Sequence, residues 1–153
     1  MLAAIRAGDV NIALFVHILG AMLLVGSLLA VAYTRVLAAR ATGGTGMIDR
    51  LTFKATILGV LPAYIVMRGG AQWVEAQENL PKEVEDSTWL GIGYMAADLG
   101  ALLVLASVIV SVVGLRRIPD GGGRGGAKAV GIMAALLVVV YVVAIWAMSA
   151  KPA

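Results

Sequence analysis

The sequence predicts an all-α membrane protein in which four transmembrane helices form a bundle and both termini lie outside. Apolar residues make up 61% of the 153 residues, charged residues make up 14%, and the mean hydropathy is +0.95. Soluble domains are nearer half apolar and a quarter charged. The apolar residues also fall into four long runs, and about 20 such residues cross a bilayer as a helix. These observations exclude a soluble globular domain, and they exclude a disordered chain, which needs low hydropathy.

The four runs define a single transmembrane domain over residues 1–153. The spans are expected at about 10–39, 51–73, 88–115 and 128–150. The second is the weakest, because Lys54 and Arg68 bracket only 13 uncharged residues. That stretch makes about 20 Å of helix against a hydrocarbon core of about 30 Å, so at least one charge is expected to snorkel or to be buried against a partner. Pro62, midway along this span, removes a backbone donor and predicts a kink.

The charges between the spans predict the orientation, since Lys and Arg are enriched in cytoplasmic loops. The first and third connections, together with the adjoining ends of the spans, each hold four basic residues: Arg35, Arg40, Arg50 and Lys54, then Arg116, Arg117, Arg124 and Lys128. The second connection, 75–86, holds five acids and one Lys. We therefore expect the basic loops in the cytoplasm and the acidic loop outside. The net charge of +3 is then a topological signal and does not indicate a nucleic-acid partner.

Three ionisable residues fall within the outer half of the predicted spans, where such groups are costly and indicate a site by default. They are His17, Arg68 and Asp98. Tyr64 lies one helical turn from Arg68, and Tyr94 lies one turn from Asp98. We expect these five residues to form one polar cluster in which Arg68 pairs with Asp98. The cluster is either a structural ion pair or a site open to the outer face for a proton, a metal ion or a small anion.

A haem or copper site is a further alternative, because histidine and methionine together ligate haem iron and thioethers suit Cu(I). His17 is the sole histidine of the chain, which excludes bis-histidine haem within one copy. The methionines expected near the outer half are Met22, Met67, Met95 and Met148. Methionine in a membrane helix is more often a packing residue, so the main interpretation includes no cofactor.

Short motifs at the two ends of the chain resemble a bacterial family. The matching positions are His17, Gly20, Gly26, Met148, Lys151 and Pro152. Over four spans this pattern resembles an uncharacterised integral membrane family, domain of unknown function 2269. The stretch 17–26 is more loosely similar to the membrane domain of the copper resistance protein D family. The closer resemblance implies a four-helix protein of the bacterial cytoplasmic (inner) membrane with no established activity.

The main functional interpretation is a small non-enzymatic membrane protein that acts as a scaffold or as an accessory subunit of a larger membrane complex. The short loops leave little room for an extramembrane domain, and the sequence shows no nucleophile–base pair or carboxylate dyad. The expected partners are membrane lipids and other membrane subunits or further copies of the chain. The alternatives are transport or sensing of a proton, an ion or a small solute through the polar cluster, and binding of haem or copper.

Overall fold

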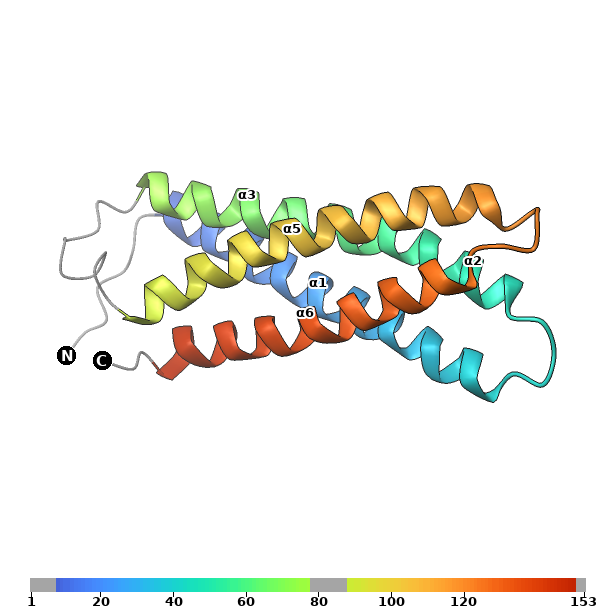
Figure 1. The fold of residues 1–153 in the computed structure, drawn as a ribbon. Helices are drawn as coiled ribbons and strands as arrows, with labels where there is room; N and C mark the ends of the chain where they lie inside the picture. Colours follow the sequence, from blue (N-terminus) through green and yellow to red (C-terminus); the bar gives the residue numbers. More distant parts are fainter. Residues whose placement is uncertain (1–7, 78–87, 151–153) are drawn as a thin grey trace.

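The fold was obtained as a computed structural model that describes residues 8–77 and 88–150. All regular secondary structure in these residues is helical. The elements are α1 (Gly8–Arg40), α2 (Gly46–Ala55), the π-helix η1 (Thr56–Val60), α3 (Leu61–Gln77), α5 (Thr88–Arg117) and α6 (Arg124–Ala150). Because α2, η1 and α3 follow one another without a break, the described residues form four helices that are long and apolar enough to cross a membrane (Figure 1). The predicted all-α bundle of four transmembrane helices is confirmed.

The second span is longer in the structure than the sequence predicted. It begins at Gly46 and ends at Gln77, a length of 32 residues, against the expected 51–73. At its start Asp49 lies in the first turn of α2, where a carboxylate is favoured by the positive end of the helix dipole. The Thr45 hydroxyl donates to Asp49 Oδ2 over 2.8 Å, so a side-chain contact stabilises the start of this helix, which lies before the long apolar run.

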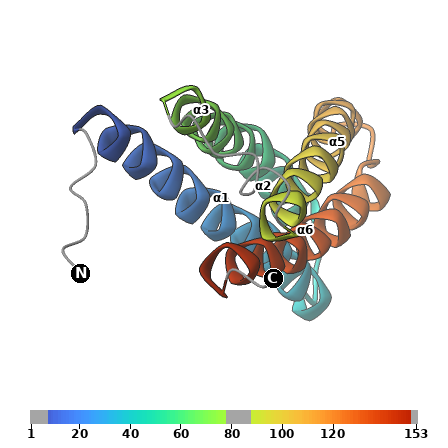
Figure 2. The same ribbon diagram turned by 90° about the vertical axis from the view of Figure 1, so that its left-hand side faces the viewer.

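The two basic connections, 41–45 and 118–123, lie at the same end of the bundle, which we call the basic end (Figure 1). Trp73, Trp89 and Trp146 lie near the opposite ends of their helices, and we call this end the tryptophan end. Figure 2 views the bundle from this end, with α1 beside α3 and α5 beside α6. The α1–α3, α5–α6 and α1–α6 pairs pack extensively, whereas α3 and α5 make few contacts.

The core runs along the middle of the bundle and is built from side chains of every span. Its largest fully buried members are Phe53, Leu24, Leu28 and Leu137. In the most apolar window of each span, only 22–33% is buried inside the bundle. The remaining apolar surface faces outward, an arrangement that lipid accommodates and that water would penalise heavily. The distribution of burial therefore agrees with an integral membrane protein.

Helices α1 and α3 approach each other closely at two glycines near the tryptophan end. A Cβ atom placed on Gly70 would lie 2.6 Å from the backbone nitrogen of His17 and 2.7 Å from its Cα. A Cβ on Gly20 would lie 2.6 Å from Met67 Cα and 2.9 Å from the carbonyl carbon of Val66. Small residues permit this kind of backbone-to-backbone contact between membrane helices. The crossing fixes His17 against α3.

A π-helical turn lies immediately before Pro62, where the sequence predicts a kink. The Leu61 N–H donates to the Thr56 carbonyl, five residues earlier, and Pro62 itself has no N–H to donate. A π-turn is one way in which a helix absorbs such an interruption of its hydrogen-bond ladder. The Thr56 hydroxyl also donates to the Thr52 carbonyl over 2.9 Å, which ties the start of the π-helix to the preceding turn of α2.

Candidate functional site

A cavity of about 280 Å³ lies at the tryptophan end, between α1, α3, α5 and α6. Its wall is mostly apolar, with residues such as Leu14, Ala97 and Ile145. Each of the four spans also contributes polar side chains to the lining: His17, Arg68, Glu75, Trp89, Tyr94 and Tyr141. An apolar cavity with a few convergent polar groups is the usual form of a small-molecule site.

His17 enters the cavity wall from α1 and is half-buried. Its Nδ1 atom lies 2.9 Å from the carbonyl oxygen of Met67. Because a carbonyl only accepts hydrogen bonds, Nδ1 carries the proton and the lone pair of the neutral ring lies on Nε2. The side chain therefore contributes a hydrogen-bond acceptor with a fixed tautomer, as a result of the α1–α3 crossing at Gly70.

Helices α3 and α5 are joined by three polar contacts that follow one another along the bundle, which we call the α3–α5 seam. The contacts are Tyr64 OH to the Ala97 carbonyl (3.3 Å), Arg68 Nη2 to Asp98 Oδ1 (3.7 Å) and Tyr94 OH to Glu75 Oε1 (2.9 Å). The donors are the two tyrosine hydroxyls and the guanidinium. The structure therefore brings Arg68 and Asp98 together and places Tyr64 beside them, whereas Tyr94 bonds to Glu75.

The expected polar cluster is divided between two environments. Arg68 lines the cavity, with 30% of its side chain exposed. Asp98 lies on the outer surface of the bundle, with 77% of its side chain exposed. Ala97 lines the cavity, and the next residue of a helix lies about 100° further round its axis. The position of Asp98 in the sequence thus directs its carboxylate away from the cavity and from His17.

Tyr141 is a cavity residue that the sequence analysis missed. It is 6% exposed, and its hydroxyl has no hydrogen-bond partner among the described residues. The hydroxyl lies against Gly100 of α5, where any side chain would collide with it. A buried hydroxyl without a partner costs about 1–3 kcal/mol, and this hydroxyl belongs to a residue that lines the cavity. Within an unbroken apolar run, a tyrosine gives no signal that separates it from a packing residue.

The methionines considered as metal ligands fall into two groups. Met67 and Met148 line the cavity that contains His17. Met22 and Met95 are 68% and 70% exposed and face outward, away from it. In residues 8–77 and 88–150, no group of three or more His, Asp or Glu side chains is placed to hold a metal ion. A haem or copper site would therefore depend on His17 with Met67 or Met148.

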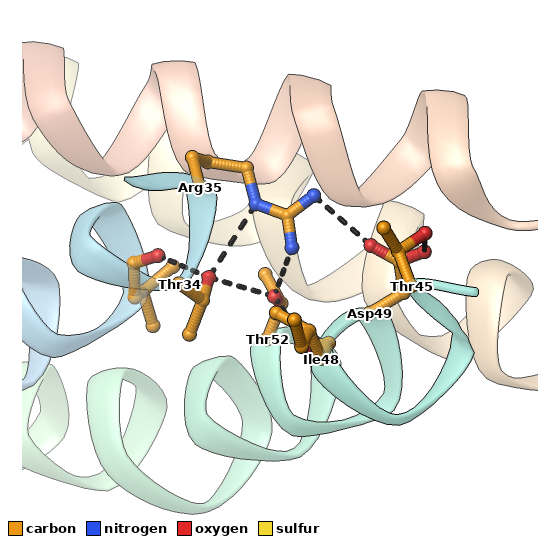
Figure 3. Close-up of polar contacts among 7 residues, drawn as sticks. Thr34, Arg35, Thr45, Ile48, Asp49 and Thr52 are labelled. Atoms are coloured by element: carbon orange, nitrogen blue, oxygen red, sulfur yellow. Dashed lines mark hydrogen bonds and ion pairs between the residues drawn. The ribbon is translucent and has the colours of Figure 1, made fainter. Parts of the chain in front are cut away.

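A second polar network lies towards the basic end and was also missed (Figure 3). Arg35 of α1 donates from Nη1 to Asp49 Oδ1 over 3.0 Å, from Nη2 to Thr52 Oγ1 over 2.7 Å, and from Nε to Thr34 Oγ1 over 3.4 Å. The Thr34 and Thr52 hydroxyl oxygens are 2.7 Å apart. Arg35 and Asp49 have side-chain exposures of 18% and 5%. The network therefore contains a buried ion pair, and all three guanidinium nitrogens of Arg35 donate hydrogen bonds within it.

Gly131 of α6 covers this network. A Cβ atom at this position would collide with Cγ of Arg35 and would lie 2.6 Å from its Cδ. The stem of Arg35 thus passes directly over the α6 backbone, and its guanidinium reaches α2. The hydrogen bonds of the network join α1 to the second span, and α6 packs against the Arg35 stem, so the geometry is that of a structural clasp.

Comparison with known proteins gives no relative from which a function could be transferred: no family model, curated protein or solved structure matches the chain. The resemblance to the uncharacterised bacterial family stays a prediction. Two of its six motif positions, Lys151 and Pro152, lie outside the described residues. Of the other four, His17 lines the cavity and Gly20 lies at the α1–α3 crossing.

Proposed function

We propose that this chain is a small non-enzymatic integral membrane protein that binds an amphipathic molecule, with an anionic head and a short apolar body, in the cavity at the tryptophan end. The observation that carries the proposal is the convergence of four spans on an apolar cavity of about 280 Å³ beside the buried, unpartnered hydroxyl of Tyr141. This function corresponds to the solute-sensing alternative of the sequence analysis.

The polar groups of the cavity suit such a molecule. Arg68 offers guanidinium N–H donors, which bind carboxylates and phosphates with charge-assisted hydrogen bonds. The Tyr141 hydroxyl can donate to the same head group or to a water beside it, and His17 Nε2 can accept a hydrogen bond from such a water. The apolar wall then takes the body of the molecule. By the distribution of Lys and Arg, this cavity lies in the outer half of the bacterial inner membrane.

A role as a scaffold or accessory subunit is the second candidate function. It is favoured by the outward-facing carboxylate of Asp98, which is 77% exposed within a membrane-spanning helix. A charge in that position calls for another molecule to cover it. The two functions are compatible, because the cavity faces the inside of the bundle and Asp98 faces outward.

Binding of decanoate to the purified protein tests the cavity proposal. Decanoate has the carboxylate head and short apolar chain that the cavity suits. We expect it to raise the melting temperature, and we expect Arg68→Gln to weaken binding by about 10–100-fold, because a hydrogen bond to a charged group contributes about 1.5–3 kcal/mol. We expect Tyr141→Phe to weaken binding by less while leaving the unliganded protein at least as stable as the wild type. Isothermal titration calorimetry in mild detergent gives the affinities.

Tyr33→Phe is the matched control, because Tyr33 is 55% exposed on α1 and should leave decanoate binding unchanged. Native mass spectrometry after gentle extraction provides an independent measurement of any bound amphiphile. The proposal is wrong if decanoate fails to bind and the protein carries no amphiphile from the membrane. It is also wrong if decanoate binds equally well to the wild type, Arg68→Gln and Tyr141→Phe.

A further inference from the structure

The carboxylate of Asp98 is exposed at a depth where lipid chains would surround it. Asp98 lies ten residues after Thr88, the first residue of α5, or about 15 Å along the helix. Trp89, a residue type typical of the membrane interface, lies almost at that end. A carboxylate in the hydrocarbon region is energetically costly, and such groups almost always face a protein interior or a partner. We therefore expect another molecule to shield the Asp98 carboxylate from lipid on this outer surface.

The ion pair with Arg68 shields the Asp98 carboxylate only in part. It joins Arg68 Nη2 to Asp98 Oδ1 at 3.7 Å, and 77% of the Asp98 side chain stays exposed. Apolar side chains surround the pair, since Met95 and Leu102, each about one turn from Asp98, and Ile65, one turn from Arg68, are all exposed. Gly69, next to Arg68, has open space where a Cβ would lie. The face thus combines one cation, one anion, an apolar rim and a position that permits close helix approach.

The charges on this face select the kind of partner. A partner surface with excess charge of either sign would leave one of the two groups unbalanced in the hydrocarbon. The matching surface has one cation and one anion at the same depth, and the chain itself carries such a surface. Because Arg68 and Asp98 contact each other, they lie at equal depth. A two-fold axis along the bundle would therefore keep two copies in the same orientation and bring each Arg68 to the other copy's Asp98.

We propose that two copies of this chain associate through the outer face of α3 and α5, with Arg68 and Asp98 forming a reciprocal pair across the interface. Each carboxylate then faces two guanidinium groups and is shielded from lipid. The second copy also covers the α3–α5 seam, which closes the side of the bundle where α3 and α5 make few contacts. This association does not depend on whether the cavity binds a ligand.

Charge exchange between two differently tagged chains tests the interface. The Arg68→Asp chain presents two acids on this face, and the Asp98→Arg chain presents two bases. We expect each variant alone to lose at least nine-tenths of the wild-type dimer, because like charges meet across the axis. Co-expression of the two variants should restore a heterodimer to near the wild-type level. Co-purification through the two tags and energy transfer between labelled chains in liposomes measure the association.

The mixture also controls for misfolding, because a fold defect within one chain is not repaired by a second defective chain. If both variants retain the wild-type helix content by circular dichroism and yet do not associate when co-expressed, the reciprocal pairing is wrong. It is equally wrong if wild-type chains stay monomeric in liposomes at every protein-to-lipid ratio. Recovery of the wild type in a stoichiometric complex with a different protein on this face would also overturn it.

Cysteine cross-linking locates the contact face without changing any charge. The chain contains no cysteine, so a single introduced thiol reports one position. Leu102→Cys places it about one turn from Asp98 on α5, at a residue that is 67% exposed. We expect oxidation in liposomes to cross-link this variant into dimers, while the matched Leu136→Cys, at a residue 54% exposed on α6, stays monomeric. The reverse result would place the interface on α6 and overturn the proposal.

Discussion

Replacing Asp49 by alanine is expected to lower the free energy of unfolding by about 3–5 kcal/mol, because it leaves the guanidinium of Arg35 buried without its counter-charge. The carboxylate accepts from Arg35 at 3.0 Å and from the Thr45 hydroxyl at 2.8 Å, and its side chain is 5% exposed. The loss should appear as unfolding at a lower fraction of sodium dodecyl sulfate in mixed micelles, followed by circular dichroism.

The double variant Arg35→Met and Asp49→Leu distinguishes the net contribution of the ion pair to stability from the cost of leaving Arg35 buried without a partner. Replacing both members of a buried ion pair by apolar residues of similar volume is often neutral or stabilising, so we expect the double variant to recover most of the stability that Asp49→Ala loses. Asp120→Ala is the matched control, because Asp120 is exposed in the connection after α5 and its removal should change little. A stability for Asp49→Ala equal to that of Asp120→Ala would show that the clasp does not hold the spans together.

The sequence predicted the fold well because the physical constraint on it is strong. Each long apolar run must be a helix in lipid, where backbone groups have no water to bond. The ends of the second span were placed less well. Its start includes Asp49 and Arg50, which interrupt the apolar pattern, and it is stabilised by the side-chain contact between Thr45 and Asp49. At Pro62 the sequence predicted a kink and not the π-turn that precedes it. The missing N–H of proline shows that the helical hydrogen bonds are interrupted, but it does not specify how the backbone accommodates the interruption.

The candidate site was predicted in part. Arg68 and Asp98 were paired correctly, because both are ionisable groups at the same depth and each needs the other. Asp98 was expected inside the site and lies outside it. The sequence gives the depth of a residue along its helix, but it does not give the side of the helix that faces the neighbouring helices. Arg35 was interpreted as a loop charge that sets topology, because its partner Asp49 lies across a turn whose path the sequence pattern does not give. Tyr141 had no signal within its apolar run.

Replacing Gly20 by valine is expected to lower the free energy of unfolding towards the upper end of about 1–3 kcal/mol, the usual cost of inserting atoms into a closely packed region. The first added atom would lie 2.6 Å from Met67 Cα and 2.9 Å from the carbonyl carbon of Val66. These are backbone atoms of α3, which cannot move aside as the end of a flexible side chain can. Helix α1 must therefore move away from α3, and the same detergent titration measures the loss.

Gly26→Val is the matched control for this substitution. Gly26 lies in the same helix, and the space where its Cβ would lie is open. Both variants therefore share the change in helix propensity from glycine to a β-branched residue and differ in the collision. Moving α1 away from α3 also lengthens the 2.9 Å contact between His17 Nδ1 and the Met67 carbonyl. Gly20→Val should therefore weaken decanoate binding as well as stability, whereas Gly26→Val should leave both near the wild-type values. Equal losses in the two variants would mean that the α1–α3 crossing does not position His17.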